Sequence, residues 1–443
     1  MTSFDANHIR GWAEGREVSE KSPAWLKEER TDALEAFCAV GLPSTKEEAF
    51  RKTSLKPLAT TKLRAPALNA VHTLPEEHLG EHLSLLIDAG KLVSQRWFHS
   101  SGDVVKEAPT GVSLFSLADI PEDMRALLGS VAKEKESALT QLNAALFEDV
   151  LVIVVEESAN ATICITHLQE KANENEVPFS LARVLVLVKA EANLELVEVD
   201  APGVSSFVAS RVLEAKVEQG ASFTHTLLSD LQKNQDMLRE IHVDIDKKAT
   251  FNSFALPCGG RIHRTELAIH LRGEEANATS FGAIVADDKA LVDVHSLIHH
   301  HVGHCKSEQE IRGILAEKGH GIFNGHVIFE KNAQLSDTAQ KNPNLLLSRD
   351  AIIDTQPVLE IYADDVKASH GSTVGQLDAD AYFYLRSRGL DEDEAYHLLV
   401  QAFAQDVLHF ASNDDVRKLL EGTIRSRLDS IIARADAAAA EAT

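Results

Sequence analysis

The stretch "VLEAKVEQGASFTHTLL" (residues 212–228) decides the fold, because its pattern returns along the chain. Apolar residues alternate with polar ones, a charged turn follows, and a small residue leads into a second short alternating run. Alternation with a period of two is typical of a β-strand. The same unit occurs in "IHVDIDKKATFNSFAL" (241–256), "LAIHLRGEEANATSFGAI" (267–284), "HVIFEKNAQLSD" (326–337) and "LEIYADDVKASHGSTVG" (359–375).

The spacing of these units predicts stacked coils. The first three strands begin near Leu213, Ile241 and Leu267, which are 28 and 26 residues apart. A strand–turn–strand unit that recurs at this length indicates a solenoid, because each coil can bury its apolar face only against the next. A Greek-key sandwich is the alternative, with turn signals roughly every 8–12 residues and no similarity at the longer period. We favour a parallel β-helix.

Helical periodicity sets the two ends of the chain apart from this strand-rich region. Residues 1–145 are predicted to be mostly helical, residues 150–372 to form the β-helix core, and residues 378–443 to be helical again. In the C-terminal region, Asp391 is a predicted N-cap with Glu394 at the reciprocal capping-box position.

Several N-terminal elements are predicted individually. The pattern indicates one strand, "KLVSQRWFHS" (91–100). It indicates three helices, of which the first ends at Gly41: "PAWLKEERTDALEAFCAVGLP" (23–43), "EEHLGEHLSLLIDAGK" (76–91) and "EKESALTQLNAALFEDV" (134–150).

Composition excludes several classes of partner. The formal net charge is −24, and so acidic a chain is repelled by nucleic acid and by acidic membrane surfaces. The first twenty residues contain no apolar signal segment, and no apolar run is long enough to span a membrane. The cysteines form no CxxC pair, which suits reduced thiols and a cytoplasmic location; they are Cys38, Cys164, Cys258 and Cys305.

The segment "HSLIHHHVGHC" (295–305) raises the question of a metal site. On a strand, His299 and His301 would share one face, and a metal ion between them could gain His304 or Cys305 as a further ligand. The alternative is a ladder of stacked imidazoles along the solenoid. We favour the ladder, because further histidines are scattered through the same region at positions 263, 270, 295, 320 and 326.

Motifs for common enzyme chemistry are missing from the sequence. There is no Gly-rich dinucleotide loop, P-loop, nucleophile elbow or HExxH zinc motif. Nothing in the residues by themselves therefore demands an enzyme.

Within residues 299–390, four pieces are the most specific: "GIFNGHVIF" (321–329), "NPNLLLS" (342–348), "DTQPVLEIYADDVKASHGSTVG" (354–375) and "YFYLRSRGL" (382–390). On these pieces the stretch resembles the SufB/SufD family of iron–sulfur cluster assembly proteins, and within it the SufD type. Near the N-terminus, "GLPSTKEEAFRKTSL" (41–55) resembles the family's opening motif, with Phe50 where Trp is usual and Lys52 where Tyr is usual.

The resemblance implies a site residue. SufB-type chains carry a cysteine needed for cluster assembly where this chain has Asn342, and an amide cannot supply a thiolate ligand. His370 is instead implied to face the SufB subunit and to accept iron or the nascent cluster, which suits a neutral imidazole. Some SufD relatives have a cysteine where this chain has Ala368.

The resemblance also implies a fold and partners. The expected fold is a right-handed parallel β-helix with helical ends, pairing with SufB through the β-helix edge and binding the SufC ATPase through the C-terminal helices. The chain would be a non-catalytic subunit, and a homodimer is possible when the partner is missing. Such scaffolds are associated with a reduced flavin, but no flavin motif is present in the sequence.

Aromatic and arginine side chains are the expected anchors of the SufC interface. They are Tyr382, Phe383, Tyr384, Arg386 and Arg388. The alternative is that the aromatics form a helix core and that the arginines are solvated.

Two other functions remain open at this point. A β-helix enzyme acting on polysaccharide would need a carboxylate-lined groove, of which the sequence gives no sign. A stand-alone metal-binding protein would use the cluster between His295 and Cys305. We expect Cys258 and Cys305 to be buried, inert thiols.

Overall fold

The chain is mainly β. The structure is a computed structural model that describes residues 4, 6–15, 23–68, 79–98, 104–105, 109–135, 137–168, 176–201 and 206–441.

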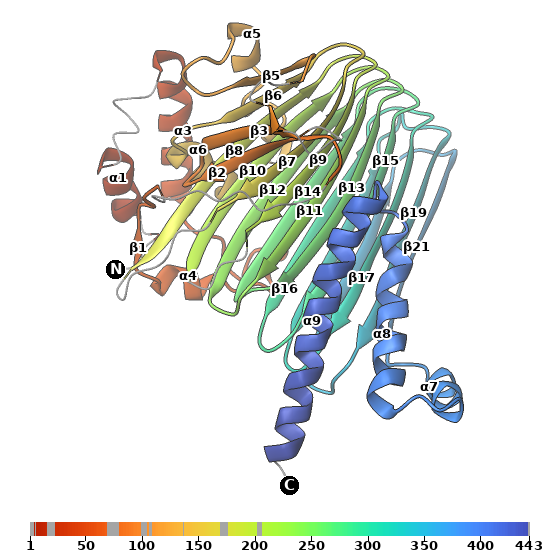
Figure 1. Cartoon of the computed structure of the whole chain (residues 1–443). Coiled ribbons are helices and arrows are strands. Elements are labelled where there is room, and N and C mark those ends of the chain that lie inside the picture. Colours follow the sequence, from red (N-terminus) through yellow and green to blue (C-terminus); the bar gives the residue numbers. More distant parts are fainter. Residues whose placement is uncertain are drawn as a thin grey trace.

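The strands alternate between two stacked sheets as the chain advances through about seven turns (Figure 1). The first sheet contains β1 (Leu63–Arg64), β5 (Val112–Phe115), β6 (Leu151–Val155), β8 (Val177–Val188), β10 (Phe207–Val217), β12 (Gln235–Ile245), β14 (Ile262–Leu271), β16 (Leu291–His300), β18 (His320–Phe329) and β20 (Ile352–Ile361). Its order is β20-β18-β16-β14-β12-β10-β8-β6-β5, with β1 beside β8.

The second sheet is built in the same way from the other strand of each turn. It contains β2 (His82–Asp88), β3 (Lys91–Phe98), β4 (Val104–Val105), β7 (Asn160–His167), β9 (Asn193–Asp200), β11 (Ser222–Leu231), β13 (Thr250–Gly259), β15 (Asn277–Ala286), β17 (Lys306–Leu315), β19 (Ser336–Leu346) and β21 (Val366–Gly375). Its order is β21-β19-β17-β15-β13-β11-β9-β7-β2-β3-β4.

The register of the strands confirms the repeat seen in the sequence. Leu213 lies opposite Ile241, and Ile241 lies opposite Leu267, all in parallel pairs. A Greek-key sandwich is therefore excluded, and the parallel β-helix with helical ends is confirmed.

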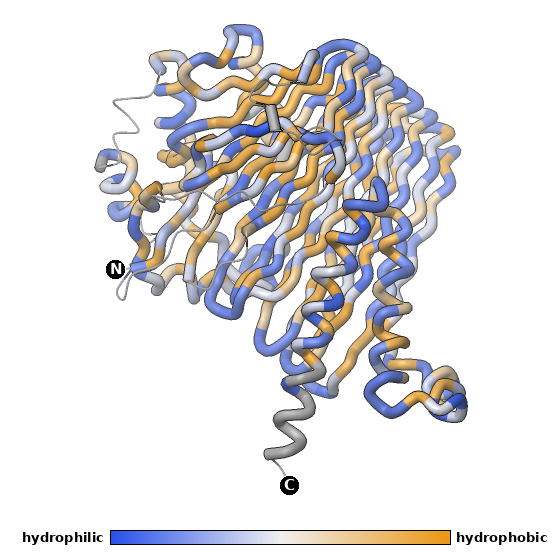
Figure 2. The backbone as a smooth tube through the Cα atoms, viewed as in Figure 1, coloured by the Kyte–Doolittle hydropathy of each residue, from blue (hydrophilic) through white to orange (hydrophobic). Residues whose placement is uncertain are grey.

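The core lies between the two sheets, where every second side chain of a strand points inward. Figure 2 shows hydrophobic residues alternating with hydrophilic ones along many strands. Leu213, Ile241 and Leu267 are buried there in a row, and the rings of Phe223 and Phe251 lie 5.3 Å apart between centroids. Like residues therefore stack on like residues from coil to coil, and each coil completes the core of its neighbour.

The N-terminal helices cover the outer face of the first sheet. α3 (Lys27–Val40) is capped by Gly41, whose φ of +75° suits glycine at a helix C-terminus. Phe37 of α3 and Leu142 of α6 (Ala138–Leu146) are buried against Phe179, Val208 and Leu238 of the sheet. The helices of this region are α1 (Ala6–Gly15), η1 (Ala24–Leu26), α3 (Lys27–Val40), η2 (Glu48–Phe50), α4 (Lys56–Thr60), α5 (Glu122–Arg125), η3 (Ala132–Lys135) and α6 (Ala138–Leu146).

Two C-terminal helices, α8 (Glu392–Leu408) and α9 (Asp414–Glu441), cover the outer face of the second sheet. The short helix α7 (Ala379–Ser387) precedes them and packs against α8. Figure 1 shows α8 and α9 side by side across the strands. Val400 and Ala404 of α8 and Leu420 of α9 are buried in one cluster with Phe254 and Phe281. None of the helices within the described ranges is long and apolar enough to cross a membrane.

The segment 41–55 ties the N-terminal region to three coils of the first sheet. The Phe50 ring lies 4.0 Å from the guanidinium carbon of Arg264 on β14. The hydroxyl of Thr53 donates to Asp293 on β16, and Lys52 pairs with Asp354 on β20 at 2.9 Å. A phenylalanine and a lysine thus make structural contacts at the two positions where this chain departs from the family's opening motif.

One predicted helix is wrong. The pattern predicts a helix over residues 76–91, but His82–Asp88 is strand β2, and residues 76–78 lie outside the described residues. β2 lies between β3 and β7, and all of its residues are buried. Leu83, Leu85 and Ile87 occupy alternate positions, as on one face of a strand, and lie in the core. The leucines at positions 79, 83 and 86 also have the spacing of a helix face, so the local pattern is ambiguous.

The other individually predicted elements are confirmed within the described residues. Helices α3 and α6 and strand β3 lie inside the predicted ranges. Asp391 caps α8, and Glu394 completes the capping box.

Candidate functional site at the open end of the β-helix

The last coil, formed by β20 and β21, leaves one end of the β-helix uncovered. Both strands are terminal in their sheets, and neither contains a buried residue, whereas β18 and β19 before them are largely buried. Large apolar side chains are exposed on or beside this coil: Leu335, Ile352, Ile361, Tyr362 and Val374. Exposed strand edges flanked by apolar side chains readily pair with another chain.

His370 lies on β21 and ends a column of polar side chains inside the solenoid. It is opposite Gln340, which is opposite Gln309, which is opposite Ser280. Gln340 Nε2 donates to Gln309 Oε1 at 2.8 Å, and Gln309 Nε2 donates to Ser296 Oγ of the other sheet at 2.6 Å. The column therefore runs between the sheets, and at its open end the imidazole of His370 is exposed.

The position of Asn342 is filled by a buried, hydrogen-bonded amide. Asn342 Nδ2 donates to the carbonyl oxygen of Ile311 at 2.6 Å, and Ser372 Oγ donates to the carbonyl oxygen of Asn342 at 3.1 Å. Ala368, two residues before His370, lies opposite Thr338. Neither position offers a thiol, so His370 is the residue of this strand best suited to bind a soft or borderline metal ion.

His370 does not sit in a preformed metal site. Among the described residues, the one group of three or more potential ligands close together is His270, His299 and His301. A single imidazole falls short of the three or four protein ligands that a bound transition metal usually has. Metal binding at His370 would therefore need ligands from another molecule.

Helix α7 presents an exposed aromatic and basic surface beside this end. The exposed fraction is 73% for Phe383 and 55% for Tyr384, and α7 has no buried residue. The Arg388 guanidinium carbon lies 5.1 Å from the Tyr384 ring centroid, and Arg386 Nη1 donates to the carbonyl oxygen of Leu390. Tyr382 is half-buried. Phe383 and Tyr384 are thus not part of a helix core, which removes that alternative for these two residues.

The two downstream cysteines are buried thiols. Cys305 Sγ donates to the carbonyl oxygen of Gly273 at 3.3 Å, and burial raises its pKa to about 11. Burial also raises the pKa of Cys258 well above its ordinary value. Both are therefore protonated at neutral pH, and a protonated thiol is a poor nucleophile and metal ligand.

The structure rearranges the ligand set that the sequence suggests for residues 295–305. His299 and His301 do lie together, with ring centroids 3.8 Å apart. His300 points inward and stacks on Phe329. Cys305 is also buried in the core between the sheets, so it cannot join His299 and His301 on the outside.

The third histidine of this group, His270, comes from the preceding coil. It lies opposite His299 in the register of β14 and β16. The sequence contains a signal for this, because positions 270 and 299 are one coil apart, but the local pattern shows His270 only as one of several scattered histidines.

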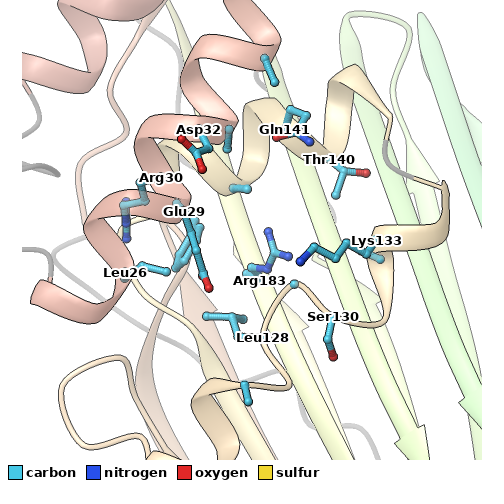
Figure 3. A pocket seen from close by; sticks show the side chains of 17 residues that line it. Leu26, Glu29, Arg30, Asp32, Leu128, Ser130, Lys133, Thr140, Gln141 and Arg183 are labelled. Atoms are coloured by element: carbon cyan, nitrogen blue, oxygen red, sulfur yellow. The ribbon is translucent and has the colours of Figure 1, made fainter.

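A cavity of about 400 Å³ lies between the N-terminal helices and the first sheet (Figure 3). Lys133 and Arg183 point toward one another there. Arg183 is paired with Glu214 at 2.6 Å, and Glu29 also lines the cavity. Burial and then the charge of Arg183 lower the pKa of Arg30 to about 10. Because acidic groups offset the basic ones, we assign no anion site to this cavity.

Comparison with known proteins agrees with this architecture. Residues 167–403 match the family model of the SufBD core domain of the SUF system for FeS cluster assembly, and residues 9–166 match that of the SufBD N-terminal region.

Relatives are found in bacteria and plants. The chain is 27% identical to iron–sulfur cluster assembly protein SufD of Escherichia coli, covering 89% of this chain and 91% of that protein. It is 26% identical to an iron–sulfur cluster assembly SufBD family protein of Synechocystis, covering 88% of each. It is 24% identical to the chloroplastic protein ABCI7 of Arabidopsis thaliana, covering 93% of this chain and 88% of that one.

Because the core model alone covers more than half of the chain, and a SufD matches over most of its length, this chain belongs to the SufBD family of iron–sulfur cluster assembly proteins and is SufD-like.

Proposed function

We propose that this chain is the SufD-like, non-catalytic subunit of a cytoplasmic iron–sulfur assembly scaffold, which pairs with a SufB-like subunit and carries a SufC-like ATPase. Its work would be to help acquire iron and to form the cluster at the subunit interface. Iron, or the nascent cluster, is the cargo of this site and is shared with the SufB-like subunit.

The observation that carries the proposal is the position of His370. It is exposed on the last strand of the second sheet, at an end of the β-helix that no described element covers. A SufB-like partner that paired with this edge would cover the apolar side chains around it and could supply the missing metal ligands.

The second support is the C-terminal region, residues 378–443, which we propose as the docking region for the ATPase. Residues 1–145 would form the N-terminal region that covers the first coils, and residues 150–372 would form the β-helix core. Tyr382, Phe383, Tyr384, Arg386 and Arg388 are the proposed anchors, since exposed aromatics beside arginines dominate many interfaces.

A mechanical link could carry motion from the ATPase to the open end. α8 packs on β15 and β17, and Arg312 Nη1 on β17 donates to the carbonyl oxygen of Phe403 on α8 at 3.0 Å. A displacement of α7 and α8 on ATP binding would thus act on β15 and β17, and through β19 on β21. We propose that this motion opens the subunit interface and makes His370 available to iron.

The test is cluster formation by the complete complex with His370→Ala. Cluster yield is measured by visible absorption after anaerobic reconstitution with iron and a sulfide source. We expect a clear loss of yield with an unchanged complex mass, because the imidazole is removed from an exposed site that contributes no packing. His8→Ala is the matched control, an exposed histidine on α1 at the other end of the chain, and should behave as wild type. An unchanged yield with His370→Ala would overturn the assignment.

A further inference from the structure

Three histidines from two neighbouring coils form a compact group on the outside of the first sheet. His270 is the last residue but one of β14 and His299 the last but one of β16, directly opposite each other, and His301 follows β16 at the turn. One ring nitrogen from each lies within 4.8 Å of the others. His270 Nδ1 and His301 Nε2 are already 3.1 Å apart.

These distances are close to those of a metal site. Two nitrogens bound to one tetrahedral ion at its usual bond length are about 3.3 Å apart. Small rotations of the imidazoles about their side-chain torsions would close the group around an ion. The backbone need not move, because His270 and His299 are held at strand ends by the parallel register.

The surroundings suit a cation. His299 Nε2 lies 3.0 Å from Glu330 Oε1, and a histidine that gives one ring N–H to a carboxylate presents its other nitrogen as a more basic ligand. His270 is buried while His299 and His301 are half-buried. One ligand is therefore held in the interior, and an ion can reach the other two from solvent.

We propose that His270, His299 and His301 bind one divalent first-row transition metal ion, with Glu330 orienting His299. Imidazole ligands suit Zn²⁺, Fe²⁺, Ni²⁺ and Cu²⁺, and a fourth position is left to water or to another ligand. The site is distinct from His370 and does not rest on the proposed function, because it is complete within this chain.

The experiment uses the full-length chain without a polyhistidine tag and in the absence of partner proteins. Co²⁺ is titrated into the metal-free protein while its visible d–d absorption is recorded. Zn²⁺ content is measured separately by elemental analysis after equilibrium dialysis. We expect one ion per chain, and a loss of affinity of about 100-fold or more in His301→Ala and in His299→Ala, which exceeds the usual effect of losing an outer-shell partner.

His326→Ala is the matched control. His326 lies on the next strand, β18, and its Nε2 is 2.9 Å from Glu360, so it repeats the histidine–carboxylate pair without the other two imidazoles. This variant should keep wild-type affinity. His301→Gln, which keeps a side chain of similar size, covers the case in which alanine disturbs the turn. Failure of the wild-type chain to bind one ion, or equal binding by wild type, His301→Ala and His301→Gln, would overturn the site.

Discussion

At the scale of single residues, the interior of the solenoid holds ionisable groups as well as apolar ones. Glu198 accepts from His167 and His225, each at 2.8 Å, and Arg239 pairs with Asp200 at 2.7 Å, all fully buried. Buried charges are tolerated only when they are paired in this way, and removing one partner leaves an uncompensated charge. These groups lie inside the coil stack, so a change in their protonation changes the stability of the fold.

Buried histidines make the stability of the fold sensitive to mild acid. Burial lowers the pKa of His167 and of His263 to about 4, from about 6.5 in an unfolded chain. As the pH falls from about 6.5 toward 4, the unfolded chain therefore takes up protons first, and stability is lost. The stability that these two histidines contribute is fully present above pH 7.

Chemical denaturation at pH 7, 6 and 5 measures this loss. Between its pKa in the folded chain and its pKa in the unfolded chain, each such histidine changes the free energy of unfolding by at most about 1.4 kcal/mol per pH unit. His263→Gln should make the slope shallower by up to that amount, since Asp200 and Arg239, the charged groups around His263, remain. Equal slopes in the variant and the wild type would contradict the explanation.

At the scale of elements, the repeated strands of the coils could be predicted from the sequence and β2 could not. Leu213, Ile241 and Leu267 recur once per coil within strands that alternate, and this recurrence gives the coil length. β2 occurs outside the repeat, its leucines fit strand and helix spacing alike, and its parallel pairing with β7 is not visible in the local sequence.

The sites show the same division between local and long-range information. His299 and His301 could be paired from the strand period alone. His270 required the register between two coils, which no local pattern contains. The exposure of His370 depends on where the stack of coils ends.

Helix α7 allows a prediction at this scale. Phe383→Ala combined with Tyr384→Ala should weaken binding of the SufC-like ATPase by at least tenfold, because hot-spot aromatics each contribute more than about 1 kcal/mol. The free energy of unfolding should change by less than about 0.5 kcal/mol, since both side chains are exposed. Calorimetric titration and urea denaturation measure the two quantities.

Val40→Ala is the control for that pair of substitutions. It removes an exposed apolar side chain from α3, at the other end of the chain. Its affinity for the ATPase should equal that of the wild type. If the α7 variant binds as tightly as this control, the ATPase docks elsewhere.

At the scale of the whole molecule, the two ends of the solenoid differ. The early coils are covered by β2 and β3 and by the N-terminal helices (Figure 1). The last coil exposes both of its strands. A repeat structure needs capping at its ends, because a terminal coil exposes the apolar and backbone groups that its neighbours bury. A partner at β20 and β21 would complete the stack, and the same event would place its side chains beside His370.

The most direct test of this account is the mass of the complex that the chain forms with its SufB-like and SufC-like partners, measured by size-exclusion chromatography with light scattering. The wild type should recover both partners in one particle. Ile352→Lys combined with Val374→Lys places charges on the exposed last coil, and it should lose the SufB-like subunit while keeping the ATPase. Val40→Lys on α3 should recover both. A wild-type chain that elutes alone, or a lysine variant that recovers both partners as the wild type does, would contradict the account.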